Sequence, residues 1–196
     1  MGMPRNVVVI AGPTGSGETT ITKAIIGRFP DRVCRLITAT TRAPREDEHG
    51  GVDYYFFSKE DFLREKEAGR ILEYTYIENR DTYYGSYGPD LQKKIAEGRV
   101  VIVNPDIVGT TYYKEHFNAT TIFIAPESVD VLMRRIRARS PEMSEEEIAH
   151  RRENAEREMS EEQSLYDYVV VNVDGKLDEA VDAIVEILNK EGYTLT

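Results

Sequence analysis

A glycine-rich stretch near the N-terminus has the composition and spacing of a phosphate-binding loop. Residues 12–19 read Gly-Pro-Thr-Gly-Ser-Gly-Glu-Thr, the pattern G-x-x-x-x-G-x-[ST], between a β-branched apolar run and a stretch with helical spacing. Glycines let the backbone curl, so that successive N–H groups and the helix N-terminus face an anion. Thr19 is then expected to contribute its hydroxyl to a Mg²⁺ ion on the bound phosphates.

One residue of this loop departs from the pattern. Glu18 stands where the motif places a lysine whose charge reaches the β- and γ-phosphates. The carboxylate removes an attraction and adds a repulsion, and one unit charge at about 4 Å is worth roughly 4 kcal/mol at an effective dielectric of about 20. Three compensations are open: Glu18 turned away from the phosphates, a divalent cation bridging it to them, or arginines from a lid. Lys23 lies one helical turn further on and is a weak substitute.

The segments after the loop resemble those of the guanylate kinase family. Residues 38–45 read Thr-Ala-Thr-Thr-Arg-Ala-Pro-Arg and residues 50–56 read Gly-Gly-Val-Asp-Tyr-Tyr-Phe, beside the family's S-x-T-T-R-x-P-R and G-x-D-Y-x-F. Glu73 and the run Tyr-Tyr-Gly-Ser at 83–86 continue the series in order. The resemblance covers nearly the whole chain. It implies a P-loop nucleoside-monophosphate kinase that transfers a phosphoryl group from MgATP to GMP.

The chemistry of the matched residues suits the roles that the resemblance implies. Arg42 and Arg45 can grip a monophosphate bidentately, and two tyrosine hydroxyls can donate to its remaining oxygens. Glu73 offers the acceptor pair that the N1–H and 2-amino group of guanine require, and adenine lacks those donors. The residues expected to bind GMP are Thr38, Arg42, Arg45, Tyr54, Glu73, Tyr84, Ser86, Asn104 and Asp106.

A second departure follows the apolar run 100–103. The family has two aspartates separated by one residue there, near Mg²⁺ and the reacting phosphates, and the first of them is Asn104 in this chain. Asp106 keeps a charge for the metal or its water shell, whereas Asn104 can only donate and accept hydrogen bonds. The predicted metal ligands are therefore Thr19 and Asp106, with Mg²⁺ entering together with ATP.

Arginines further along the chain resemble the family's lid. Arg135 and Arg139 match its R-L-x-x-R stretch, and Arg151 matches the arginine of its returning helix. Arginines that close over a transferred phosphoryl group neutralise charge and exclude water. The predicted catalytic residues are Arg42, Arg135, Arg139, Arg151 and Asp106. The predicted ATP-binding residues are Gly12, Pro13, Thr14, Gly15, Ser16, Gly17, Glu18, Thr19, Thr20 and Asn172; for Asn172, a structural turn residue is an equally good interpretation.

The elements that must position these residues alternate between strands and helices. Apolar runs typical of buried strands lie at 6–11, 35–39, 100–103, 121–125 and 168–173. Helical spacing predicts helices over 19–29, 59–68, 88–96, 129–138, 144–165 and 177–189. This order predicts an α/β fold, a parallel-sheet P-loop kinase core with helices on both faces.

Two segments interrupt the alternation within a single domain of residues 1–196. Residues 40–88 are rich in tyrosine, glycine and charge, and their pieces 53–57 and 71–77 are predicted as strands of a small GMP-binding, β-rich insertion. Residues 134–162 carry basic and then acidic side chains along a helical hairpin, predicted as a helical lid. Without the resemblance, a solvated helix pair would be the simpler interpretation of that charge run.

The amino-acid composition limits the kinds of partner that the protein is expected to bind. The 196 residues are 40% apolar, enough for one domain with a sizeable core. A net charge of −10 with no basic stripe argues against nucleic acid. The one cysteine, Cys34, lies among apolar residues and cannot form an internal disulfide. No apolar run reaches membrane-spanning length, and the N-terminus has no signal-peptide core. A cytoplasmic location is therefore expected, without a membrane partner.

Three functions remain compatible with the residues. The first is a guanylate kinase that converts ATP and GMP to ADP and GDP. The second is a catalytically impaired guanylate-kinase-like module, weakened by Glu18 and Asn104, that binds GMP or a phosphopeptide. The third is a kinase of another small phosphorylated acceptor, which Glu73 and the paired tyrosines disfavour. Turnover with GMP separates the first from the second, and the sequence leaves the oligomeric state open.

Overall fold

A five-stranded parallel sheet forms the centre of the molecule. The computed structural model describes residues 5–196, so the first four residues of the predicted domain 1–196 lie outside it. The strands run in the order β2-β7-β1-β8-β9. β1, which carries the glycine-rich loop at its carboxyl end, is the middle strand, as expected for a binding loop at the switch point of an α/β sheet. The strands are β1 (Val7–Ala11), β2 (Val33–Arg35), β7 (Val100–Val103), β8 (Thr120–Pro126) and β9 (Tyr168–Asn172).

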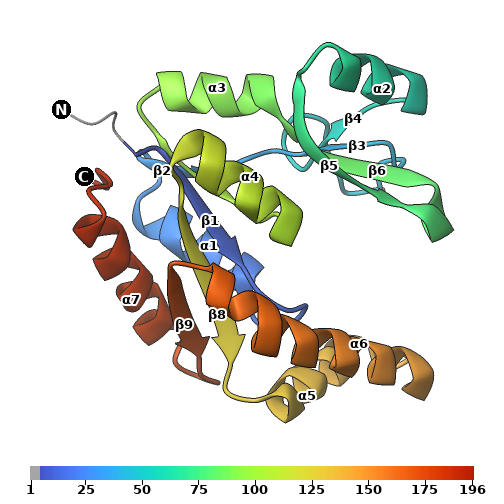
Figure 1. The fold of residues 1–196 in the computed structure, drawn as a ribbon, viewed down its shortest axis with the longest axis vertical. Helices are drawn as coiled ribbons and strands as arrows, with labels where there is room; N and C mark the ends of the chain where they lie inside the picture. The colour runs from blue at the N-terminus through green and yellow to red at the C-terminus, as the bar shows by residue number, and fades with distance from the viewer. Residues whose placement is uncertain (1–4) are drawn as a thin grey trace.

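Helices cover both faces of this sheet (Figure 1). They are α1 (Glu18–Arg28), α3 (Gly88–Ala96), α4 (Ile107–Phe117) and α7 (Leu177–Lys190). Successive side chains of a strand point to opposite faces, so β1 contributes to two apolar layers. Val8 and Ile10 pack in the layer with α1 and α7. Val7 and Val9 pack in the layer with α3 and α4.

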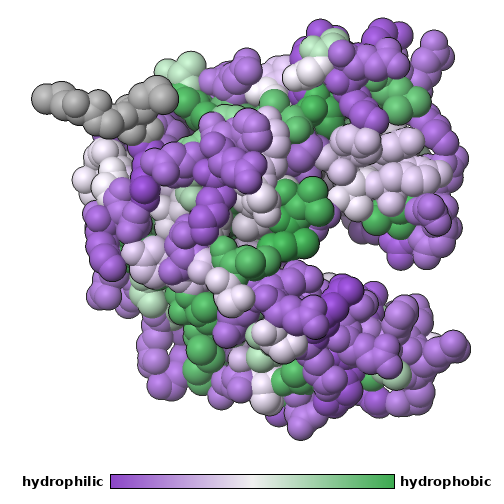
Figure 2. All heavy atoms as spheres, in the orientation of Figure 1, coloured by the Kyte–Doolittle hydropathy of each residue, from purple (hydrophilic) through white to green (hydrophobic). Residues whose placement is uncertain are grey.

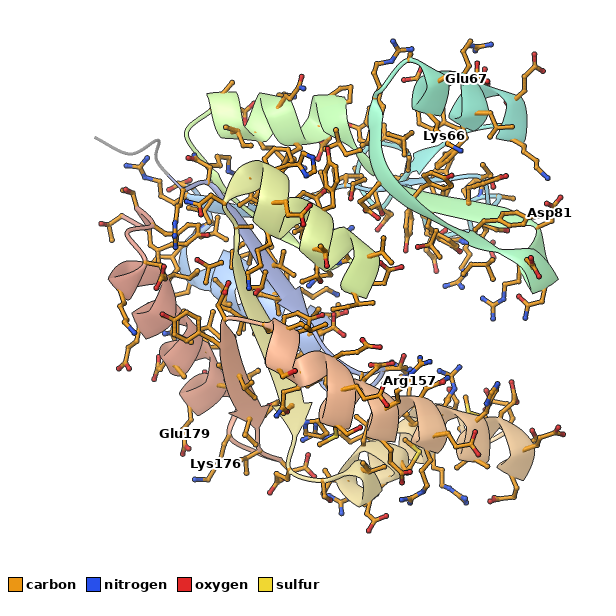
Figure 3. The ribbon with its side chains drawn as sticks, viewed as in Figure 1. Lys66, Glu67, Asp81, Arg157, Lys176 and Glu179 are labelled. Atoms are coloured by element: carbon orange, nitrogen blue, oxygen red, sulfur yellow. The ribbon has the colours of Figure 1, made fainter. Side chains whose placement is uncertain are left out.

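A smaller sheet stands beside this core. Its strands follow the order β4-β3-β6-β5, and only β3 and β4 are parallel to each other. Phe62 of the adjoining helix is fully buried against Ala39 and Ile71. Asp81, labelled at the far end of the β5–β6 hairpin in Figure 3, accepts hydrogen bonds from Lys59 and Tyr76 at 2.5 Å each. The elements are β3 (Ala39–Thr40), β4 (Tyr55–Phe56), α2 (Lys59–Glu67), β5 (Ile71–Ile77), a 3₁₀ turn (Glu78–Arg80) and β6 (Thr82–Tyr87).

A helical hairpin extends from the other side of the core. It consists of α5 (Val129–Arg139) and α6 (Glu145–Arg157). Ser144 and Glu147 cap α6 reciprocally, each side chain bonding the other residue's backbone N–H. The hairpin has an apolar seam of its own, formed by Leu132, Met133, Ile136, Ile148 and Ala155. The charged side chains of the predicted lid range 134–162 therefore lie around a packed interior.

Most predicted elements are present, with four differences. The predicted strand 35–39 divides into the end of β2 and the start of β3, which belong to different sheets. The predicted helix 144–165 ends at Arg157 and continues as a π turn (Glu158–Glu162) and a 3₁₀ turn (Gln163–Leu165). Helix α4 and strand β6 were not predicted. Within residues 5–196, no helix has the length and apolar character needed to cross a membrane.

The C-terminal segment is fastened to the middle of the sheet. Tyr193 is buried, and its hydroxyl donates to the carbonyl oxygen of Val7 at 2.6 Å. The same hydroxyl accepts from the backbone N–H of Thr120 at 3.0 Å. These bonds give hydrogen-bonding partners to the Val7 carbonyl and the Thr120 N–H, at the amino-terminal ends of β1 and β8, where the ladder between the two strands begins.

Candidate active site

The glycine-rich loop has the backbone that its sequence predicts. Gly15 and Gly17 adopt φ angles of 95° and 103°, in the left-handed region that glycine tolerates. Gly17 precedes the first residue of α1, so the loop ends at a helix N-terminus. A Cβ at Gly12 would overlap the carbonyl oxygen of Ile124 on β8. The loop is therefore held close against the sheet and opens toward the cavity above α1.

That cavity has a volume of about 360 Å³ and contains Glu18. Burial raises the pKa of Glu18 to about 8, and the neighbouring charge of Glu158 on the lid contributes in the same direction. The raised pKa favours the neutral form of Glu18, and a neutral carboxyl group can donate a hydrogen bond to a phosphate oxygen, which weakens the repulsion expected from the sequence.

The predicted arginines of the helical hairpin lie at different sides of the phosphate loop. Arg135 and Arg139 line the cavity that contains Glu18. Arg135 is tied down, since it donates to the Asp174 carboxylate at 2.8 Å and to the Asn172 carbonyl at 2.8 Å. Arg151 instead lines a small cavity of about 60 Å³ against the Pro13–Thr14 side of the loop. The three predicted arginines do not converge on one point in this conformation.

Asn172 fastens β9 to the phosphate loop. Its side-chain amide donates to the carbonyl oxygen of Ser16 at 2.7 Å, and its own carbonyl accepts from Arg135. A Cβ at Gly17 would overlap that amide. Asn172 also lines the cavity above the loop, so its position fits both interpretations made from the sequence.

A second cavity of about 320 Å³ lies over the accessory sheet. Thr19 lines this cavity and the one above the phosphate loop, so a single residue of α1 borders both. Figure 2 shows the hollow between the surface of the accessory sheet and that of α5 and α6. The predicted acceptor residues that line the second cavity are Thr38, Tyr54, Glu73, Tyr84, Ser86, Asn104 and Asp106.

Glu73 lies on the floor of this second cavity. It accepts a hydrogen bond from the hydroxyl of Ser86 on the neighbouring strand. Burial raises the pKa of Glu73, although the bond from Ser86 opposes that shift. Helix α4 approaches closely, since a Cβ at Gly109 would lie 3.0 Å from a Glu73 carboxylate oxygen. The side chain is thus confined between β6 and α4.

Arg42 and Arg45 do not line this cavity directly. Arg42 forms a two-armed ion pair with Glu48, each arm 2.8 Å long, and lies over the ring of Tyr54 with its central carbon 5.3 Å from the ring centroid. Glu48 also accepts from the backbone N–H of Arg45 at 2.8 Å. Hydrogen bonding from Arg42, then from Arg45, lowers the pKa of Glu48 to about 2. The arginine is therefore beside Tyr54 and Tyr84, already paired with a carboxylate.

Asn104 and Asp106 have structural partners. Asn104 donates to the carbonyl oxygen of Ile10 at 2.7 Å, which joins β7 to β1. Asp106 caps α4 by accepting from the Gly109 N–H at 3.0 Å, and its other oxygen accepts from the Thr75 hydroxyl at 2.6 Å. Asp106 was predicted as a metal ligand, but both of its carboxylate oxygens accept hydrogen bonds from other residues of the protein.

The donor set fits a Mg²⁺ ion that enters with its nucleotide. Within residues 5–196, no group of three or more His, Cys, Asp or Glu side chains could hold a metal ion. Mg²⁺ usually keeps several waters and binds through one or two protein groups plus substrate phosphates. Thr19 meets that requirement between the two cavities. Asp106 suits a contact through a water molecule, because its own oxygens are engaged.

Four residues of the site escaped the prediction. Glu48 and Asp174 are the carboxylates that hold Arg42 and Arg135. Thr75 supports Asp106 from the acceptor cavity, and Glu158 lies near Glu18. Only Thr75 carried a sequence signal, because it lies two residues after Glu73 on the same predicted strand and therefore on the same face.

Comparisons with known proteins agree with this arrangement. The family model "Guanylate kinase" matches residues 4–191. A guanylate kinase of Caldanaerobacter subterraneus is 40% identical over 186 residues, which cover 94% of this chain and 87% of that protein. A guanylate kinase of Helicobacter pylori is 35% identical over 183 residues, covering 93% and 85%.

Solved structures show the same relationship. The crystal structure of guanylate kinase from Anaplasma phagocytophilum superposes with a TM-score of 0.68 at 25% identity, covering 98% of this chain and 89% of that one. The central parallel sheet, the glycine-rich loop and the matched segments thus have one common explanation. The chain belongs to the guanylate kinase family.

Proposed function

We propose that the protein transfers the γ-phosphoryl group of ATP to GMP. The observation that carries the proposal is the pair of cavities that meet at Thr19. One lies over a phosphate-binding loop and suits ATP, and the other contains Glu73 and suits guanine. Two reactants held on either side of one residue are placed for direct in-line transfer, in which positioning supplies much of the rate.

The residues of the chain take separate parts in this reaction. Tyr54 and Tyr84 donate to the acceptor phosphate beside Arg42 and Arg45, and Glu73 accepts from guanine. Arg135, Arg139 and Arg151 stabilise the charge that spreads over the transferred group once the lid closes. Thr19 would hold Mg²⁺ together with nucleotide oxygens and water, and the bound ion would neutralise charge at the phosphates.

The proposed roles of these residues divide the molecule into an acceptor-binding segment, a lid and a core. Residues 40–88 form the acceptor-binding insertion and residues 134–162 the lid of one domain. ATP and GMP are its small-molecule partners, and a net charge of −10 disfavours nucleic acid. A cytoplasmic location is consistent with the single, buried Cys34.

A coupled assay of ADP release with GMP, dGMP, AMP and UMP tests the proposal. Turnover is expected with GMP and far less with AMP, because Glu73 meets two donors from guanine and none from adenine. Glu73→Gln is expected to lower the ratio of the turnover rate with GMP to that with AMP, because an amide offers guanine one acceptor and one mismatched donor. Equal rates with GMP and AMP in the unmodified protein would contradict the guanine assignment.

A second candidate is a GMP-binding module without turnover. It rests on Glu18 in the position of the loop lysine and on Asn104, whose amide is engaged with Ile10. The two functions separate in one pair of measurements. Calorimetric binding of GMP together with the absence of ADP release favours the module, whereas ADP release that depends on GMP excludes it.

A further inference from the structure

Glu48 is held by several hydrogen bonds in the loop between β3 and β4. Its carboxylate binds Arg42 through both oxygens and also accepts from the Arg45 backbone, while its own N–H donates to the Arg45 carbonyl at 3.1 Å. The pair is largely shielded, with 20% of the Arg42 side chain and 16% of the Glu48 side chain exposed. One carboxylate therefore holds the turn 45–48 and the guanidinium together.

An inventory of the Arg42 donors shows what this pair leaves free. A guanidinium has five N–H groups in a planar fork. Nη1 donates to Glu48 and to the Ala43 carbonyl, and Nη2 donates to the other Glu48 oxygen, each at 2.8 Å. Neither Glu48 nor Ala43 engages the Nε–H and the second N–H of Nη2, and the Tyr84 hydroxyl is a further hydrogen-bonding partner of the guanidinium. These two groups lie side by side and form a second fork of the kind that binds carboxylate or phosphate bidentately.

The surroundings fix the plane of that second fork. The rings of Tyr54 and Phe56 lie 5.3 and 5.9 Å from the guanidinium carbon, so aromatic faces limit its rotation. Glu48 and then the Tyr84 hydroxyl, both hydrogen-bonding partners, raise the pKa of Arg42. Tyr54 and Tyr84 also line the acceptor cavity. The remaining donors are thus held beside the two tyrosines proposed to bind the acceptor phosphate.

We propose that Glu48 is a positioning residue, which locks Arg42 through one fork so that the other is preset for the phosphate monoester of the acceptor. The assignment rests on the proposed function, since it deepens the acceptor site. It competes with an opposite role, in which Glu48 is an internal anion that occupies the arginine and must be displaced by the phosphate. The two roles predict effects of opposite sign.

The test compares GMP and guanosine binding by calorimetry in the full chain. Glu48→Gln keeps the size of the side chain but loses the charge, and Glu48→Asp keeps the charge but shortens the reach. Asp47→Asn and Glu46→Gln remove the same charge from exposed positions of the same loop and serve as matched controls. Guanosine lacks the phosphate and reports whether the base site is intact.

Glu48→Gln is expected to weaken GMP binding by roughly 10–100-fold, the range seen when an outer partner of a metal ligand is removed. The affinity of Glu48→Gln for guanosine should stay within about twofold of that of the unmodified protein. The GMP affinity of Glu48→Asp should lie between those of Glu48→Gln and the unmodified protein, and both control variants should bind GMP as the unmodified protein does. Tighter GMP binding in Glu48→Gln would show that Glu48 is an anion which the phosphate must displace, and would overturn the assignment. Unchanged GMP binding, or an equal loss for guanosine, would also overturn it. Absence of GMP binding by the unmodified protein would instead overturn the proposed function and this assignment with it.

Discussion

Two carboxyl groups of the proposed site have pKa values that are shifted in opposite directions. Burial, aided by Glu158, raises the pKa of Glu18 to about 8, whereas hydrogen bonds from Arg42 and the Arg45 backbone lower that of Glu48 to about 2. The difference arises from the surroundings: burial beside Glu158 disfavours the charge of Glu18, whereas hydrogen bonds from Arg42 stabilise that of Glu48. At the residue scale, the departure from the family motif is therefore a loss of positive charge more than a gain of negative charge.

Glu18→Lys tests that loss. The lysine is expected to raise kcat with GMP by at least tenfold, or about 1.4 kcal/mol in the barrier, because its charge acts most strongly as the bridging bond breaks. The KM for GMP should change little, since the acceptor lies in the other cavity. Steady-state kinetics at saturating ATP measure both constants. Glu186→Lys on the exposed side of α7 is the matched control, and a lower kcat in Glu18→Lys would show a productive role for the carboxyl group.

The protonation of Glu18 also links stability to pH. Native Glu18 holds its proton up to about pH 8, but the unfolded chain releases it near the ordinary value of 4.5. Between these values the native state binds more protons, so this residue lowers stability as the pH rises. The Glu18→Gln variant has no buried carboxyl group to ionise, so its gain in stability over the unmodified protein should grow from pH 5 to pH 9. Each kcal/mol of that gain should raise Tm by about 2–4 °C. Melting curves across that range measure it, and a pH-independent difference would contradict the raised pKa.

Helix α4 illustrates the element scale. Its first turn carries Asp106 as the cap and Gly109, whose missing Cβ lets the helix approach Glu73 and Pro105. The approach leaves no room for a methyl group, since a Cβ at Gly109 would lie 2.6 Å from that of Pro105. The helix thus confines the carboxylate of Glu73, which is proposed to bind guanine, while its cap Asp106 lines the same cavity.

Gly109→Ala is expected to lower thermal stability and to raise the KM for GMP, because α4 must move away from Glu73. Gly27→Ala is the control, since Gly27 is also helical but nothing lies within 4 Å of an added Cβ. That change should stabilise the protein by roughly 0.5–1 kcal/mol through helix propensity. Melting temperatures and steady-state kinetics distinguish the two variants, and equal behaviour would mean that the close approach at Gly109 is unimportant.

Sequence patterns predict some elements of this molecule well and others poorly. Helices α3 and α7 were predicted within one residue because their apolar positions face a single layer and turn residues bound them. Residues 107–117 contain β-branched and aromatic side chains with an early glycine, which obscure helical spacing. Assigning Asp106 to a metal also concealed its role as a cap. Glu48 stands in a run of charge, where only the folded turn decides which carboxylate meets Arg42.

At the scale of the whole molecule, the accessory sheet and the helical hairpin face each other across the hollow that Figure 2 shows, and Figure 1 shows both extending from the central sheet. Arg151 borders a different side of the phosphate loop from Arg135 and Arg139. All three can act on one phosphoryl group only after the hairpin changes its position. Binding of both substrates should therefore make the molecule more compact.

Small-angle scattering measures that change. A compact chain of this length has a radius of gyration of about 16 Å. A bisubstrate analogue that joins adenosine and guanosine through phosphates is expected to reduce the measured radius, and GMP alone to reduce it less. Arg151→Ala should diminish the response to the analogue. An identical radius with and without the analogue would show that catalysis does not require closure.

The bonds of Tyr193 have a consequence for how the protein is made. Synthesis proceeds from the N-terminus, so β1 emerges before the other strands, yet the carbonyl of Val7 receives its partner from Tyr193, 186 positions later. Its sheet neighbours β7 and β8 begin near residues 100 and 120. The central strand therefore emerges from the ribosome well before its partners, and its amino-terminal end is completed only after residue 193 has left the exit tunnel.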